Sequence, residues 1–206
     1  IVLTNDDGIN SPGLLAAAKA LDPLGWVLVV APREQQSGSG RSMLSNADGE
    51  ISLRRKLIND DQWEMYSVGG SPAQSVQCAL FEIADSKPDL VVSGINYGEN
   101  VGSGTTISGT VGAALEGASF GIPALAVSLE MDLPYHMSHS DEIDFTAPGH
   151  FTHMFARILL NMPASHDVDL LKVDVPSDST LQTPWRVTCQ SRQKYWVPIK
   201  ADEMRT

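Results

Sequence analysis

The hydrophobic positions of this chain fall into short continuous runs, separated by longer segments in which apolar residues recur with helical spacing. Largely apolar runs of strand length occupy residues 1–3, 26–31, 89–92, 124–128, 170–175 and 185–189. Runs without regularly alternating polar positions indicate strands that are buried on both faces, as in a parallel sheet. We therefore predict a strand at each of these six places.

Segments with apolar residues at helical spacing lie between these runs, at residues 14–24, 73–84, 113–118 and 151–162. Ser11-Pro12 and Ser71-Pro72 precede the first two, which is the pattern of an N-cap followed by proline at the first helical position. The first thirty residues therefore predict a β-α-β unit, for which parallel strands and a right-handed crossover are the default.

The region between the second strand and the second helix is more polar. Residues 51–53 and 64–68 read as short strands separated by a polar turn at residues 59–61, and we expect a small hairpin beside the main sheet. The segment from residue 190 to 206 has no clear period and is expected to be extended or poorly ordered. A chain of 206 residues is of the size of one domain, so we expect a single domain over residues 1–206.

Composition excludes some classes of function. Apolar residues make up 42% of the chain, the net charge is −11 and the pI is about 4.7. Because no basic cluster is present, we do not expect binding to a nucleic-acid duplex. We find no signal peptide and no apolar run long enough to span a membrane, and expect a cytoplasmic protein without membrane contact. The absence of an initial Met and the abrupt end at Thr206 suggest that the native chain is longer.

The two cysteines, Cys78 and Cys189, are far apart and lack the spacing of metal ligands. We expect both to be buried free thiols in a reducing compartment.

Polar residues gather where three of the predicted strands end. Asp6 and Asp7 follow the first strand, a loop of residues 32–42 that includes Ser37 follows the second, and residues 93–100 with Asn96 follow the third. The carboxyl ends of parallel strands face the crevice in which open α/β sheets bind ligands. Two adjacent carboxylates repel each other and need a cation or several donors, so a metal ion is one consistent occupant.

Each of these segments also has a simpler explanation. Asn-Asp-Asp-Gly is a common turn composition, and the glycine- and serine-rich loop could be a flexible connector. Ser108, Gly109 and Thr110 stand at the start of a predicted helix, where backbone N–H groups and two hydroxyls suit a phosphate. The alternative at that position is N-capping of the helix by Ser108 or Thr110.

The segment from residue 130 to 148 is polar and contains His136 and His139, followed by Asp141, Glu142 and Asp144. Its spacing lacks a helical histidine pair or a zinc pattern, so a solvated loop is favoured over a metal site. His153 lies in the last predicted helix and is expected to be a surface or packing residue.

Several segments together resemble the SurE family, the stationary-phase survival proteins that act as metal-dependent nucleoside monophosphate phosphatases. The matching segments appear in the family's order and cover most of the first 130 residues: LTNDDGINSPG (3–13), VVAPREQQSG (29–38), GGSPA (69–73), PDLVVSGINYGEN (88–100), SGTVGAALEG (108–117) and GIPALAVS (121–128).

The resemblance implies an α/β fold, a three-layer α/β/α sandwich with a Rossmann-like, mostly parallel sheet. It implies one divalent cation per subunit, Mg²⁺ or Mn²⁺, bound by Asp6, Asp7, Ser37 and Asn96, and hard oxygen ligands of this kind suit these metals rather than zinc. It also implies phosphate contacts from Asn100, Ser108, Gly109 and Thr110, and a homodimer or homotetramer in which later segments, in the variable region from about residue 130, are exchanged.

The expected activity is hydrolysis of nucleoside 5′- and 3′-monophosphates, with Asp6 or Asp7 taking a proton from the attacking water. An aspartyl-phosphate route is the mechanistic alternative. A broad acid phosphatase or exopolyphosphatase, and a metal-nucleotide binding module without turnover, are the rival functions.

This chain departs from the family pattern at three places. Ser71-Pro72-Ala73-Gln74 stands where the family's helix commonly opens with an acid, and Ile107 stands where an aromatic residue commonly precedes SGTV. The family's C-terminal strand pattern is not recognisable before Thr206.

Overall fold

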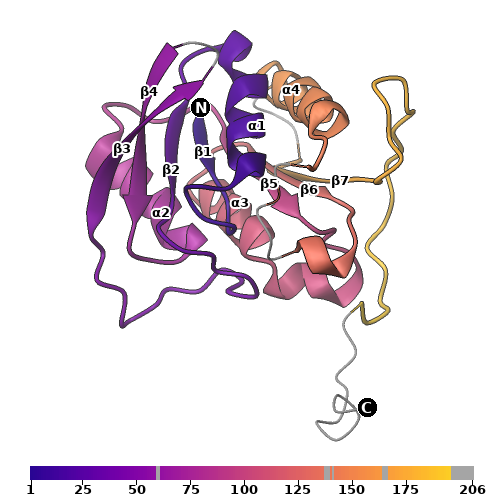
Figure 1. The fold of residues 1–206 in the computed structure, drawn as a ribbon, viewed down its shortest axis with the longest axis horizontal. Helices are drawn as coiled ribbons and strands as arrows, with labels where there is room; N and C mark the ends of the chain where they lie inside the picture. The colour runs from indigo at the N-terminus through magenta and orange to yellow at the C-terminus, as the bar shows by residue number, and fades with distance from the viewer. Residues whose placement is uncertain (59–60, 137–139, 141, 164–166, 196–206) are drawn as a thin grey trace, which may run out of the picture.

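A mostly parallel sheet forms the centre of the protein in the computed structural model, which describes residues 1–58, 61–136, 140, 142–163 and 167–195. Within these residues seven strands pair in the order β3-β4-β2-β1-β5-β6-β7 (Figure 1). All neighbouring strands are parallel except β3 and β4, which form an antiparallel hairpin. The strand bounds are β1 Val2–Thr4, β2 Leu28–Pro32, β3 Ile51–Ile58, β4 Asp61–Val68, β5 Val91–Tyr97, β6 Ala124–Leu129 and β7 Leu170–Val175.

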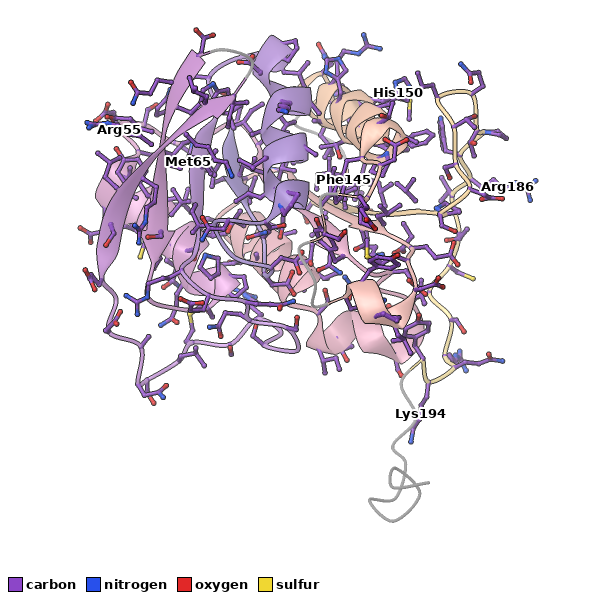
Figure 2. The ribbon with its side chains drawn as sticks, viewed as in Figure 1. Arg55, Met65, Phe145, His150, Arg186 and Lys194 are labelled. Atoms are coloured by element: carbon purple, nitrogen blue, oxygen red, sulfur yellow. The ribbon has the colours of Figure 1, made fainter. Side chains whose placement is uncertain are left out.

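Helices cover both faces of this sheet. α1 (Pro12–Leu21) and α4 (Thr146–Leu160) pack on one face, and α2 (Pro72–Cys78) and α3 (Gly109–Ser119) pack on the other (Figure 1). Two separate hydrophobic cores result, one on each side of the sheet. Figure 2 shows Met65 of β4 inside the molecule and Arg55 of β3 at its outer edge. Shorter helical segments follow or precede these helices, at Asp22–Leu24, Ala79–Ile83, Gly102–Ile107 and Leu133–Tyr135.

The three-layer α/β/α architecture predicted from the sequence is confirmed. The β-α-β unit formed by β1, α1 and β2 is present, with Ser11 at the N-cap of α1 and Pro12 at its start. Ser71 caps α2 through a capping box in which Gln74 replaces the acid of the family pattern: Gln74 N donates to Ser71 Oγ, and Ser71 N donates to Gln74 Oε1.

The hairpin is longer than predicted and belongs to the main sheet, because β4 pairs in parallel with β2. Asp61 lies in β4 rather than in a turn, and residues 59–60 are outside the described residues. α4 begins at Thr146, five residues before the predicted start.

The third predicted strand was placed too early. β5 runs from Val91 to Tyr97 and so includes the polar residues that we had assigned to a loop after the strand. These residues are buried. β1 pairs with β5 only as far as Ser93, whereas β6 also pairs with Asn96 and Tyr97 after a register shift between Ser93 and Asn96. β6 therefore supplies the backbone partners that make the polar end of β5 acceptable in a strand.

The strand predicted at residues 185–189 is absent, and this prediction was wrong. The segment has no regular structure and is exposed, because β7 ends the sheet and no described strand pairs with it. Cys189 is exposed and Cys78 is only half-buried, so the expectation that both thiols are buried was wrong. Both cysteines are free thiols, as expected. No described helix has the length and apolar character needed to cross a membrane.

Candidate metal and phosphate site

Two buried carboxylates lie immediately after β1, at the carboxyl end of the central strands. Asp6 is 4% exposed and Asp7 is 1% exposed. Thr110 Oγ1, at the start of α3, donates to Asp6 Oδ1 at 2.5 Å. The backbone amides of Gly109 and Thr110 are also directed to Asp6. Burial raises the pKa of Asp6, and these donors at the helix N-terminus oppose the rise.

Asp7 has fewer donors than Asp6. The backbone amide of Tyr97, at the end of β5, donates to Asp7 Oδ2 at 3.2 Å, and Gln35 Nε2 donates to Oδ1 at 3.3 Å. Burial, followed by repulsion from the Asp6 carboxylate, holds the pKa of Asp7 well above its ordinary value. The two adjacent acids therefore have unequal surroundings, and Asp7 is the one more readily protonated.

Among the described residues, no lysine, arginine or histidine forms an ion pair with Asp6 or Asp7. A buried pair of carboxylates without a positive partner is costly, and a divalent cation is the group that offsets this cost most directly. Carboxylate, hydroxyl and amide oxygens are the ligands that Mg²⁺ and Mn²⁺ prefer, so the donor set fits such an ion.

Ser37 and Asn96 are the other two predicted metal ligands. They come from the ends of β2 and β5, the two strands that pair with β1. Ser37 lies in the loop after β2, where its Oγ accepts a hydrogen bond from Gln35 Nε2 at 3.0 Å; Gln35 Nε2 also contacts Asp7. Asn96 is buried in β5, and its Nδ2 donates to the carbonyl oxygen of Gly98 at 2.6 Å. That bond uses the amide nitrogen, so the side-chain oxygen is the atom that Asn96 can offer to a cation.

The four predicted phosphate contacts make different bonds, and two of them, Gly109 and Thr110, lie against Asp6. Ser108 Oγ accepts from the backbone amide of Val111 at 3.2 Å, so Ser108 is the N-cap of α3. Gly109 and Thr110 face Asp6. Ser108 therefore caps α3, whereas Thr110 has a different partner; the phosphate contacts stay a prediction.

Asn100 is held further along the same edge of the sheet. Its Nδ2 donates to Ser128 Oγ at 3.0 Å, and its backbone amide donates to Asp174 Oδ1 at 3.0 Å. Asp174 in turn forms an ion pair with Lys172, whose pKa is lowered by burial. Residues of β6 and β7 therefore fix the loop that carries Asn100.

Close packing sets the loop after β2 against the start of α3. A Cβ at Gly112 would clash with the carbonyl oxygen of Gly40, so only glycine allows this approach. Arg41 Nε donates to Glu116 Oε2 at 2.5 Å, and the buried Glu116 carboxylate also accepts from Gln77 Nε2 at 2.8 Å. These contacts place the loop that contains Ser37 beside Asp6.

Ser39 belongs to the same loop and points into the site. A Cβ built on Gly109 would lie 2.8 Å from both Ser39 Oγ and Asp6 Oδ2. The Ser39 hydroxyl is buried and has no hydrogen-bond partner among the described residues. An orphaned hydroxyl facing a carboxylate is consistent with a site that receives a polar ligand.

Three groups at this site were missed by the sequence analysis: the side chains of Gln35 and Ser39, and His136. The carbonyl oxygen of His136 accepts from Gln35 Nε2 at 3.2 Å, and its ring packs on Gly98, where a Cβ would clash with it. Gln35 and Ser39 lie in the loop of residues 32–42, which the sequence analysis had singled out, but no sequence signal linked residue 136 to that loop.

The outcome for the other polar residues around residue 136 is simple. His139 and Asp141 are outside the described residues. His153 packs as expected, with Nδ1 2.9 Å from the carbonyl oxygen of Ala20.

A family model described as Survival protein SurE matches residues 1–197 of this chain. The chain belongs to the SurE family. The resemblance read from its motifs is thereby confirmed, and the match extends through β7, beyond the segments that carried the resemblance in the sequence.

Individual SurE proteins are similar over nearly the whole chain. The 5′-nucleotidase SurE of Thermococcus gammatolerans is 42% identical over 197 residues, covering 95% of this chain and 71% of that protein. The 5′-nucleotidase SurE of Methanothermobacter thermautotrophicus is 41% identical over 207 residues, covering 97% and 76%. The crystal structure of the SurE protein from Aquifex aeolicus superposes with a TM-score of 0.67 at 36% identity and covers 85% of this chain. This chain spans 65% of the Aquifex protein, slightly less than two thirds.

Proposed function

We propose that this protein is a divalent-metal-dependent phosphomonoesterase that hydrolyses nucleoside 5′- and 3′-monophosphates to nucleoside and phosphate. The observation that carries the proposal is the buried Asp6–Asp7 pair, which has no cationic partner among the described residues and adjoins the N-terminus of α3. Relatives at about 40% identity are named 5′-nucleotidase SurE, which supports the same reaction class.

In this proposal Asp6, Asp7, Ser37 and Asn96 hold one Mg²⁺ or Mn²⁺ ion. When bound, the ion would lower the pKa of a water and offset the negative charge of the phosphoryl group. Asn100, Ser108, Gly109 and Thr110 would receive the phosphoryl oxygens, with the helix N-terminus contributing its amides and dipole. Thr110 and the α3 amides stabilise the ionised form of Asp6 and oppose the rise in its pKa, while the raised pKa of Asp7 suits it to accept the proton of the attacking water.

The test is phosphate release from a panel of 5′- and 3′-nucleoside monophosphates, with p-nitrophenyl phosphate and short polyphosphate as comparisons. Each substrate is assayed with Mg²⁺, with Mn²⁺ and with chelator, for the wild type and for Asp7→Asn. We expect metal-dependent release that falls by a factor of at least about 100 in the variant, since the carboxylate serves in both metal binding and proton transfer.

Equal turnover of all phosphomonoesters and polyphosphate would favour the broad phosphatase alternative. If calorimetry showed nucleotide binding but no phosphate were released, the protein would be a nucleotide-binding module rather than an enzyme. Hydroxylamine trapping of a phosphorylated aspartate would replace direct water attack by the covalent route. The proposed homodimeric or homotetrameric assembly and cytoplasmic location rest on the resemblance and the composition.

A further inference from the structure

The side-chain amide nitrogen of Gln35 lies at a point where three acceptors converge. It is 3.0 Å from Ser37 Oγ, 3.3 Å from Asp7 Oδ1 and 3.2 Å from the carbonyl oxygen of His136. These acceptors come from three different segments: the loop after β2, the end of β1, and the residues that follow Leu133–Tyr135. An amide nitrogen carries two hydrogens, so the three contacts share two donors.

Two of these three acceptors are proposed metal ligands. Mg²⁺ binds its oxygen ligands at about 2.0–2.1 Å, closer than any hydrogen-bond donor. The Gln35 amide nitrogen lies 3.3 Å from Asp7 Oδ1 and 3.0 Å from Ser37 Oγ, on the side where a cation bridging the two oxygens would sit. The Gln35 amide and such a cation would therefore compete for the lone pairs on that side.

The third acceptor connects this exchange to another part of the molecule. His136 is held by its ring, with Nε2 3.0 Å from the carbonyl oxygen of Met131, and by its backbone amide, which donates to the carbonyl oxygen of Leu133. The ring packs on Gly98, whose carbonyl oxygen accepts from Asn96 Nδ2. Residues 131–136 thus lie against the loop next to a further proposed metal ligand.

We propose that Gln35 is a positioning residue that competes with the cation and couples cation binding to residues 131–136. In this mechanism, cation binding displaces the Gln35 amide from Asp7 and Ser37, and the same displacement removes the donor to the His136 carbonyl. The proposal rests on the metal site of the proposed function, but it assigns to Gln35 a role separate from ligation and from chemistry.

The first test is Mn²⁺ binding by calorimetry at about pH 8, with wild type, Gln35→Met and Gln36→Met. Methionine keeps the length of the side chain but removes the amide donors. We expect Gln35→Met to bind Mn²⁺ roughly 3- to 10-fold more tightly, the size expected when one competing hydrogen bond is lost. Gln36→Met is the matched control, because the recorded contact of Gln36 with Asp6 uses its backbone amide, and its affinity should match the wild type.

The second test is amide hydrogen exchange of residues 131–136, which reports on the coupling without any activity assay. Mn²⁺ should speed exchange in this segment of the wild type several-fold. In Gln35→Met the exchange should already be fast without Mn²⁺ and should not respond to it. Melting temperatures and circular dichroism of all three proteins would establish that each is folded.

Four results would overturn the proposal. Weaker Mn²⁺ binding by Gln35→Met would indicate that Gln35 is itself a metal ligand. Unchanged binding would indicate that Gln35 does not compete with the cation. Exchange at residues 131–136 that ignores both Mn²⁺ and the substitution would remove the coupling. If the wild type bound no Mn²⁺ at all, the metal site of the proposed function would itself be wrong, and this inference would fail with it.

Discussion

Asp6 and Asp7 are adjacent in the chain but meet different neighbours. Asp6 faces the donors at the start of α3, whereas Asp7 has one backbone amide and one side-chain amide and carries the larger rise in pKa. Environments that separate the pKa values of two nearby carboxyl groups also separate their chemical roles. We infer that Asp7, which lacks the helix-terminal donors of Asp6, is the proton acceptor of the pair.

We expect Asp7→Asn to melt at a higher temperature than the wild type in chelator at neutral pH. The folded-state pKa of Asp7 lies above its unfolded value, so its contribution to stability falls as pH rises from the ordinary value through the folded one. Asparagine removes the free-energy cost of a buried, ionised Asp7, and 1 kcal/mol corresponds to roughly 2–4 °C in melting temperature for a domain of this size. Calorimetry in chelator near pH 8 and near pH 4 tests this prediction. The difference in melting temperature between the variant and the wild type should be smaller at pH 4.

Asp6→Asn is the matched comparison for that experiment. The pKa of Asp6 is also raised by burial, but the donors from Thr110 and the α3 amides offset part of that rise, and asparagine would lose them. The gain in melting temperature should therefore be smaller for Asp6→Asn than for Asp7→Asn. An equal or larger gain for Asp6→Asn would contradict the assigned difference between the two acids.

Metal affinity should rise with pH at the same site. Protons compete with the cation for Asp7, and because its pKa is raised, this competition extends to higher pH than for an ordinary aspartate. Titrations of Mn²⁺ at a series of pH values should show tighter binding as the pH increases, followed by a plateau. Affinity that is constant from about pH 5 upwards would mean that the pKa of Asp7 is not raised in solution.

At the scale of elements, the site depends on how closely α3 approaches the loop after β2. Gly40 and Gly112 make this approach possible, and the Arg41–Glu116 pair holds it. Asp6 and the Ser37 loop are therefore placed relative to one another by the packing of a helix rather than by the strands alone.

Gly112→Ala should lower both stability and Mn²⁺ affinity, because the new methyl group would push the Gly40 loop away from α3. Overpacking of this kind typically costs about 1–3 kcal/mol. Gly149→Ala in α4 is the control, since its methyl group would meet the nearest atom, Ala20 Cβ, at an ordinary 3.7 Å. Gly149→Ala should be neutral or slightly stabilising, and an equal loss in both variants would contradict the proposed role of the loop contact.

Much of the architecture was predictable because its signals are local. Short stretches of sequence were enough to predict several elements: the apolar runs predicted β1, β2 and β6, and the Ser-Pro pairs predicted the starts of α1 and α2. The extension of β5 through Asn96 and Tyr97 was not predictable, since it depends on pairing with β6, a strand further along the chain. The prediction of a strand at residues 185–189 was wrong because a strand also needs a partner. The composition of this segment suits a strand, but no described strand pairs with it.

The same distinction applies to the site. The acids and amides at strand ends were recognisable because the carboxyl ends of parallel strands meet at one edge. The roles of Thr110 and Gln35 were not, because each depends on a bond across a large sequence separation, to Asp6 and to the carbonyl of His136. The ligand assignments themselves, and the phosphate contacts, stay predictions until the metal and substrate experiments are done.

At the scale of the whole molecule, the described residues after β7 form a peripheral segment. Residues 176–195 run along the outside of the sheet and helices (Figure 1). Trp185 packs edge-on against Phe155 of α4 at 5.7 Å, and Gln190 and Gln193 bond to the backbone of Gly102 and Ser103. Most of this segment is exposed, so few contacts oppose its local opening.

Trp185→Ala should speed proteolytic cleavage within residues 176–195 several-fold while changing the free energy of unfolding by less than about 1 kcal/mol. The reason is that Trp185 is 55% exposed and contributes to docking of the segment rather than to either core. Limited proteolysis with mass spectrometry measures the cleavage. Trp26→Ala, at a 70% exposed tryptophan, is the control and should leave the cleavage rate unchanged.

Within the part of the chain that the structure describes, β3 and β7 are the two edge strands of the sheet. Unpaired border strands are templates on which other chains can polymerise, and charged side chains are a common protection. β3 carries the exposed cations Arg54, Arg55 and Lys56 in succession. A strand added beside β3 would have to desolvate these charges, so self-association of this protein should not continue the sheet beyond β3. Fibril formation should become faster when the three basic residues of β3 are neutralised.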